Sequence, residues 1–249
     1  MKLFTRSIKT ALKFITATAT TLALSIPSYA NGVFRPSAFK VKFYEIGLRN
    51  SATAERTPIF LSTDGTTLDL SNTKDHIDSL SAGQRTPALG SWDQVYALLS
   101  NTITASGNDG TCFIENGATD TDNDGRWEIV TAVAANAGEG SYTEPSYGDG
   151  GFLGPNDPSV TSNVNGTPVT SLKQWLVSSS NPTPGGGGAI NRMLFIGTTA
   201  QPVVVTDGPK KVTYYVDVNE ALRMVDGTGN NQGCAAVRSN IIRFNIGIE

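Results

Sequence analysis

Apolar residues recur at every second position along much of the chain, which is the period of a β-strand with one buried face. The segment 39–43 alternates Phe, Val and Phe with lysines, and the segments 212–218 and 241–249 alternate in the same way. About ten such segments and no internal repeat are found. The pattern predicts an all-β protein, a Greek-key or jelly-roll-like β-sandwich.

The first of these segments changes phase in its middle. After Phe43, the apolar set continues at Tyr44, Ile46 and Leu48, so the buried positions shift by one residue. A shift of this kind indicates either a β-bulge or a strand that passes from one sheet to another.

Several further strands are expected. Strands at 58–62 and 67–70 flank Asp64-Gly65, a dipeptide typical of hairpin turns. Segment 92–104 fits either a helix or a strand, and its β-branched end favours a strand. Strands are also expected at 113–115, 127–133, 192–196 and 202–206.

A Gly- and Pro-rich stretch at about 138–188 interrupts the strand pattern. Long irregular stretches within a domain are usually functional or disordered. We expect a surface insertion or a linker, with one short helix at 171–177 that carries Leu172, Trp175 and Leu176.

The first thirty residues have the pattern of a secretory signal peptide. A basic start without acidic residues precedes an apolar run from Phe14 to Ile26, and Ser28-Tyr29-Ala30 offers small residues for cleavage. The expected mature protein is a single domain, 31–249, exported to the cell surface or the extracellular medium by the general secretory route.

Removal of this segment makes the protein more acidic. The full chain has 19 basic and 22 acidic residues, and the segment 1–30 takes four basic residues, which leaves 15 against 22, a net charge of −7. This balance argues against nucleic acid as a partner, because phosphates require clustered Lys and Arg. No later segment resembles a membrane span.

The two cysteines agree with export. Cys112 and Cys234 each lie in a Gly-containing segment. An even number of cysteines in an oxidising compartment favours a disulfide. The alternatives are two unpaired thiols or, with the single histidine His76, a metal site.

The segment Asp120-Thr-Asp122-Asn-Asp124-Gly125 places carboxylates at alternate positions of a tight loop, where their oxygens converge. Calcium is bound by oxygen ligands of this kind. Thr131 stands where an EF-hand has its final Glu, and the nearest substitutes are Glu115 and Glu128, of which Glu128 is the predicted ligand. The motif resembles the Asp-rich calcium loops of secreted bacterial β-proteins, and it predicts a structural Ca²⁺ ion; the alternative is a solvated acidic turn.

The sequence motifs for catalysis are weaker than the motif for calcium binding. His76 has no nucleophile-elbow Gly-x-Ser-x-Gly to accompany it, and no spacing selects a pair of carboxylates for glycoside hydrolysis. We therefore expect no enzymatic activity. Aromatic residues that would form a sugar-binding platform, or else belong to the core, are Trp92, Trp127, Trp175, Tyr142 and Tyr147.

The first strand of the mature chain is a candidate for assembly. Its apolar residues are Phe39, Val41, Phe43, Tyr44, Ile46 and Leu48. Such a strand either closes its own sheet or is donated to the sheet of a neighbour, and repeated donation builds a filament.

The layout of the chain resembles that of bacterial envelope sandwich proteins and pilin-like filament subunits. A signal peptide, a short leader and an early Lys-alternating strand precede a Gly- and Thr-rich β-region with a terminal strand. The resemblance implies a secreted structural or adhesive subunit that binds copies of itself or a cell-surface partner. The alternative functions are a calcium-stabilised carbohydrate-binding module and, third, a secreted hydrolase.

The calcium hypothesis predicts that EDTA lowers the melting temperature of the protein and that added Ca²⁺ restores it. Replacing Asp122 and Asp124 with Asn is expected to abolish this shift, because two carboxylate ligands are lost. Differential scanning calorimetry measures the shift, and an identical melting curve with and without EDTA contradicts the site.

Overall fold

The computed structural model describes residues 33–72, 80–110, 112–117, 130–131, 134–143, 150–153, 162–184, 188–207, 211–226, 234–239 and 243–249. Nearly all regular structure in them is β, which confirms the all-β prediction. The elements are β1 (Val33–Phe34), β2 (Ala38–Arg49), β3 (Arg56–Asp69), β4 (Gly90–Ser106), β5 (Phe113–Ile114), β6 (Val130–Thr131), the 3₁₀ turn η1 (Ala134–Asn136), β7 (Gly140–Thr143), β8 (Gly150–Leu153), β9 (Asn163–Val164), β10 (Thr167–Ser178), β11 (Ile190–Val205), β12 (Val212–Asp217), β13 (Leu222–Asp226), β14 (Cys234–Ser239) and β15 (Arg243–Ile248).

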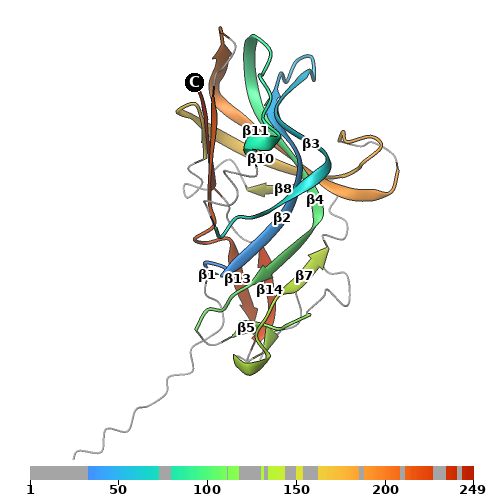
Figure 1. Cartoon of the computed structure of the whole chain (residues 1–249), viewed down its shortest axis with the longest axis vertical. Coiled ribbons are helices and arrows are strands. Elements are labelled where there is room, and N and C mark those ends of the chain that lie inside the picture. The colour runs from blue at the N-terminus through green and yellow to red at the C-terminus, as the bar shows by residue number, and fades with distance from the viewer. Residues whose placement is uncertain are drawn as a thin grey trace, which may run out of the picture.

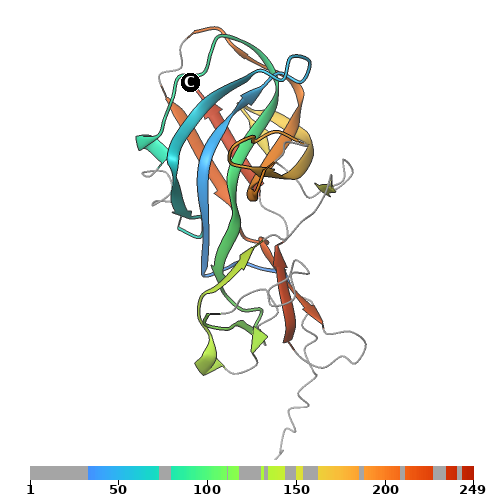
Figure 2. The ribbon, with the colours of Figure 1, turned by 90° about the vertical axis from the view of Figure 1, so that its right-hand side faces the viewer.

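Ten strands form one large sheet, in the order β12-β15-β9-β10-β11-β4-β2-β3, with β7 added to β4 and β8 to β10. The sheet is barrel-like, curling around an apolar interior (Figures 1 and 2). Its two ends approach across that interior, where the Tyr214 hydroxyl of β12 donates to the Ile59 carbonyl oxygen of β3 at 3.0 Å. The finer prediction, a Greek-key or jelly-roll sandwich, stays a prediction.

A smaller part of the molecule lies at the end of strands β2 and β4 (Figure 2). It contains the sheet β1-β13-β14 and the pair β5-β6. An ion pair between Lys40 of β2 and Glu139 joins the two parts. Both side chains are partly exposed, so this pair contributes little stability. No helix among the described residues is long and apolar enough to span a membrane.

Strand β2 contains the predicted change of phase. Its register against both neighbours shifts between Phe43 and Glu45, so Tyr44 is the bulged residue. Phe39, Val41 and Phe43 are buried before the bulge, and Ile46 and Leu48 are buried after it. Because both halves pair with β3 and β4, the β-bulge is the correct alternative.

The hairpin predicted at Asp64-Gly65 is wrong. Strand β3 runs from Arg56 to Asp69 along a single partner, β2, and Ser62 to Gly65 loop out opposite Tyr44. Gly65 supplies the positive φ of 77° that this excursion needs. The turn residues therefore make a large bulge, after which the chain continues in its original direction.

The helix predicted at 171–177 is also wrong, because this segment belongs to β10 and pairs with β11 along its length. Further strands, β7, β8 and β9, lie in the stretch 138–188 that was expected to be irregular. The segments 192–196 and 202–206 form one strand, β11, with a register shift between Thr198 and Val203. The strand prediction for 92–104 is confirmed by β4.

Gly47 of β2 is a point of close approach. A Cβ atom at this position would lie 2.4 Å from the Thr57 carbonyl oxygen and 2.6 Å from the Tyr96 hydroxyl. The carbonyl belongs to the backbone of β3 and the ring of Tyr96 is fully buried, so neither moves aside easily. Only glycine fits at this close contact between β2, β3 and β4.

Asp69 fastens the beginning of β2 to the end of β3. Its Oδ1 accepts hydrogen bonds from the Phe39 amide at 3.0 Å and from the Ser71 amide at 3.1 Å. Burial acts to raise the pKa of this carboxyl, but the hydrogen bonds from Phe39 and Ser71 outweigh it and hold the pKa below 3.8. The charged form of Asp69 is therefore favoured by folding.

Gly47→Ala is expected to lower the free energy of unfolding by about 1–3 kcal/mol through overpacking between β3 and β4. Gly247→Ala is the matched control, because its Cβ meets only the Thr213 side chain. Urea denaturation measures both, and equal losses in the two variants contradict the proposed crowding at Gly47.

Asp69→Asn is expected to cost about 1 kcal/mol at neutral pH, allowing for solvent screening of a partly exposed group. Because the folded-state pKa of Asp69 is lowered, the wild-type advantage is complete above the ordinary value of 3.8 and is lost as the pH falls through the folded pKa. Urea denaturation between pH 7 and pH 2 checks this difference, and a constant difference over that range contradicts it.

Candidate functional site

The predicted calcium ligands Asp120, Asp122, Asp124 and Glu128 lie outside the described residues, as does His76. The calcium site stays a prediction. Within the described ranges, no group of three or more His, Cys, Asp or Glu side chains is arranged to hold a metal ion.

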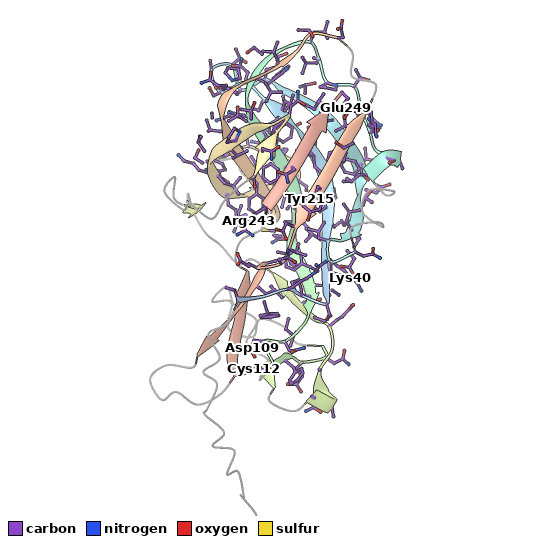
Figure 3. All side chains as sticks on the ribbon, turned by 90° about the vertical axis from the view of Figure 1, so that its left-hand side faces the viewer. Lys40, Asp109, Cys112, Tyr215, Arg243 and Glu249 are labelled. Carbon is purple, nitrogen blue, oxygen red and sulfur yellow. The ribbon has the colours of Figure 1, made fainter. Side chains whose placement is uncertain are left out.

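The cysteine segments come together in the smaller part of the molecule. Cys112 is fully buried, and its amide donates to the Asp109 carboxylate at 2.8 Å (Figure 3). Cys234 begins β14, which contacts β6, and β6 pairs with β5 directly after Cys112. The side chain of Cys234 is outside the described residues, so the disulfide remains a prediction that the backbone favours.

The proposed donor residues, Phe39 to Leu48, lie in β2, which is the last but one strand of its sheet. Strand β2 is hydrogen-bonded to β3 on one edge and to β4 on the other. Phe39 and Leu48 are fully buried. This pairing corresponds to the alternative in which the first strand closes its own sheet, and donation of these residues stays a prediction about an assembled state.

An open edge lies instead on β12. The Lys211 amide donates to the Glu249 carbonyl at 3.2 Å, and the Glu249 amide donates to the Lys211 carbonyl at 3.0 Å. Hydrogen-bonded pairs recur at every second residue of an antiparallel ladder, so the backbone groups of Thr213 and Tyr215 also point toward β15, at Gly247 and Asn245. The backbone groups of Val212, Tyr214 and Val216 then point to the other edge. No described residue bonds to them.

The side chains of β12 suit an edge that accepts another strand. Val212 to Val216 are strong β-formers, and the strand is bounded by Lys211 on one side and Asp217 on the other. Tyr214 is buried and Tyr215 is 48% exposed, so a half-exposed aromatic ring lies beside the edge of β12 (Figure 3).

The opposite end of the sheet is covered. The Leu61 amide of β3 donates to the Gly83 carbonyl, and the Arg85 amide donates to the Ile59 carbonyl, both at 2.9 Å. The segment following Leu80 thus occupies part of the edge of β3. Among the described residues, β12 is therefore the end of the strand order whose outer backbone groups have no partner.

A cluster of aromatic and cationic side chains lies on the outer face of the sheet. The Arg192 guanidinium stacks 3.5 Å from the centre of the Tyr44 ring, and Arg56 lies 5.1 Å from the ring of Tyr96. Burial, reinforced by Glu45, which accepts a hydrogen bond from the Tyr96 hydroxyl, raises the pKa of Tyr96.

This outer cluster has a structural role. Arg56 also donates to the Pro182 carbonyl oxygen at 2.9 Å, which ties the turn between β10 and β11 back to the start of β3. Stacked cations contribute about 0.5–2 kcal/mol each. The cluster therefore holds the β10–β11 turn against the sheet.

The aromatic residues proposed for sugar binding do not form a described platform. Trp92 is buried in the core, and its indole nitrogen donates to the Ala88 carbonyl. Trp175 is partly buried against the outer-face cluster that contains Tyr96. Trp127, Tyr147 and the side chain of Tyr142 lie outside the described residues.

The interior of the curled sheet contains an apolar cavity of about 140 Å³. Its described walls come mainly from β2, β4 and β11 on one side and from the paired strands β12 and β15 on the other, and none of these described lining residues is charged. Phe195, Val216 and Phe244 among the lining residues are only partly buried, so the cavity opens toward the surface.

Comparison with protein-family models, curated proteins and solved structures finds no significant match to this chain. Its function must therefore be argued from the site geometry itself.

Sequence reasoning missed the open edge of β12 and the cavity. The alternation at 212–218 predicted a strand, but the sequence of a strand does not show whether one or both of its edges are hydrogen-bonded to neighbouring strands. The exposed Tyr215, outside the apolar phase of its strand, is the one local signal of an exposed apolar patch beside that edge.

Proposed function

We propose that the protein is a non-enzymatic, secreted structural or adhesive subunit that associates with further copies of itself at the cell surface. The observation that carries the proposal is the open edge of β12. Main-chain hydrogen bonds to Val212, Tyr214 and Val216 provide affinity for an added strand, and the Tyr215 ring provides contact area beside it.

Assembly through this edge does not require a change in the subunit's own fold. Donation of Phe39 to Leu48, in contrast, withdraws a strand bonded on both edges and exposes its buried side chains. Edge pairing at β12 is thus the less costly route, and donation of β2 is the second.

The alternative of a calcium-stabilised carbohydrate-binding module depends on residues around Asp120 and Trp127. Binding of immobilised glycans by a monomer, lost after Trp127→Ala, would favour that function over assembly.

The assembly proposal predicts polymers whose amount increases with protein concentration, seen by negative-stain microscopy and analytical ultracentrifugation. The double variant Thr213→Lys/Tyr215→Lys is expected to remain monomeric, because charges beside an edge strand oppose pairing. Both side chains are exposed, so folding is retained.

Val204→Lys is the matched control, since it adds a charge at an exposed position of β11, away from β12. It is expected to polymerise normally. A wild-type protein that is monomeric at all concentrations, or polymers unaffected by the β12 lysines, would contradict edge pairing.

A disulfide between β2 and β3 distinguishes the two routes. Lys42 and Thr67 are cross-strand partners, so Lys42→Cys/Thr67→Cys locks β2 into its own sheet. Polymers that persist after oxidation support the β12 edge, whereas their loss identifies β2 as a donated strand.

A further inference from the structure

The backbone groups of β12 that point away from β15 are spaced symmetrically along the strand. They belong to Val212, Tyr214 and Val216, and no described residue bonds to them. Tyr214 stands at the centre of this set. A second β12 strand that runs antiparallel, about a twofold axis at Tyr214, therefore brings Val212 opposite the partner's Val216. In this register every outward amide and carbonyl of the three residues gains a hydrogen bond.

Other antiparallel registers of β12 on itself pair this edge less completely. A shift of two residues in either direction leaves one of the three residues opposite position 210 or Val218, which lie outside the strand. A shift of one residue places side chains of opposite faces across from each other. The register centred on Tyr214 is therefore the one that the strand itself favours.

The charges at the two ends of the strand fit the same register. Lys211 precedes β12 and Asp217 ends it, so pairing about Tyr214 places Lys211 opposite the partner's Asp217 at both ends. Opposite charges directly across two antiparallel strands stabilise the pairing, and like charges destabilise it. A parallel, in-register pairing would instead bring like charges together at each end. The end charges thus select the antiparallel, twofold arrangement.

The side chains beside this edge have room for these contacts. Lys211, Thr213, Tyr215 and Asp217 share one phase of the strand, and the first three are exposed. The Asp217 carboxylate lies 3.6 Å from the guanidinium of Arg243, its neighbour on β15. The partner's Lys211 approaches this carboxylate from the opposite side, where the edge is open. On the same face, the half-exposed Tyr215 ring meets the partner's Thr213.

We propose that two copies of the protein form a twofold symmetric dimer in which their β12 strands pair antiparallel and are centred on Tyr214. This inference rests on the proposed assembly at the β12 edge and specifies its register and symmetry. Because the same patch contacts itself on both copies, the contact closes and joins two subunits. Larger polymers then form by contact between such dimers.

Disulfide cross-linking tests the register. Thr213 and the partner's Tyr215 form a non-hydrogen-bonded pair, with Cα atoms about 4.5 Å apart, which a disulfide can bridge. A mixture of the single variants Thr213→Cys and Tyr215→Cys is expected to give a covalent dimer under mild oxidation. Each variant alone is the control and is expected to give none, because its two thiols lie on a diagonal, about 7–8 Å apart. Non-reducing electrophoresis detects the dimer, and mass spectrometry identifies the linked peptides.

Charge reversal tests the same register without new cysteines. Lys211→Glu is expected to weaken dimer formation about tenfold, because it places like charges at both ends of the paired strands. Lys211→Arg keeps the charge and is expected to dimerise as the wild type does. Lys173→Glu makes the same change in net charge at an exposed position of β10 and is the second control. Sedimentation equilibrium at low ionic strength measures the dissociation constants, since salt screens exposed pairs.

A covalent dimer from either cysteine variant alone, or none from the mixture, overturns the proposed register. Equal dissociation constants for Lys211→Glu and Lys173→Glu overturn it as well. In these cases assembly at β12 still stands if Thr213→Lys/Tyr215→Lys is monomeric while the wild type associates. A wild-type protein that does not associate at all contradicts the proposed function and the dimer together, so the two failures are distinguishable.

Discussion

The pairing of β2 on both edges is the constraint on which the rest of the structure depends. Through it, β3 and β4 are placed on either side of one strand, and the bulge at Tyr44 keeps apolar residues inward along its length. Gly47 permits the close approach of Thr57 and Tyr96. A change in this strand alters both the interior and the outer face, because its alternating side chains contribute to each.

The two edge strands of the sheet, β3 and β12, differ in how their outer backbone groups are paired. The end at β3 is covered by the segment after Leu80, whereas the end at β12 has backbone groups without partners among the described residues. Exposed edges promote unwanted association, and natural proteins normally protect them with charges, proline or short strands. At β12 such residues stand at the two ends, Lys211 before the strand and Asp217 at its end, whereas Val212 to Val216 between them are strong β-formers.

The period-two pattern was sufficient to predict the β class and the change of phase in β2, because each depends on local alternation, and the β-branched end of 92–104 favoured the strand that β4 forms. It failed at Asp64-Gly65 and at Leu172 to Leu176, where local preference gave a hairpin and a helix. In both places pairing with a distant strand decides the structure: β2 continues beyond the excursion, and β11 fixes β10. The cavity was unpredictable for the same reason, since Phe43, Phe195 and Phe244 meet only through the order of strands in the sheet.

The paired strands β12 and β15 form both the end of the sheet and one wall of the interior cavity. Tyr214 is buried and Val216 partly buried on the same phase of β12, whereas Thr213 and Tyr215 of the other phase are exposed, and Tyr215 also borders the cavity. The open-edge backbone groups belong to the same residues whose side chains face the interior. A strand added at β12 would therefore extend the wall of the cavity, so pairing at this edge and enclosure of the interior are geometrically linked.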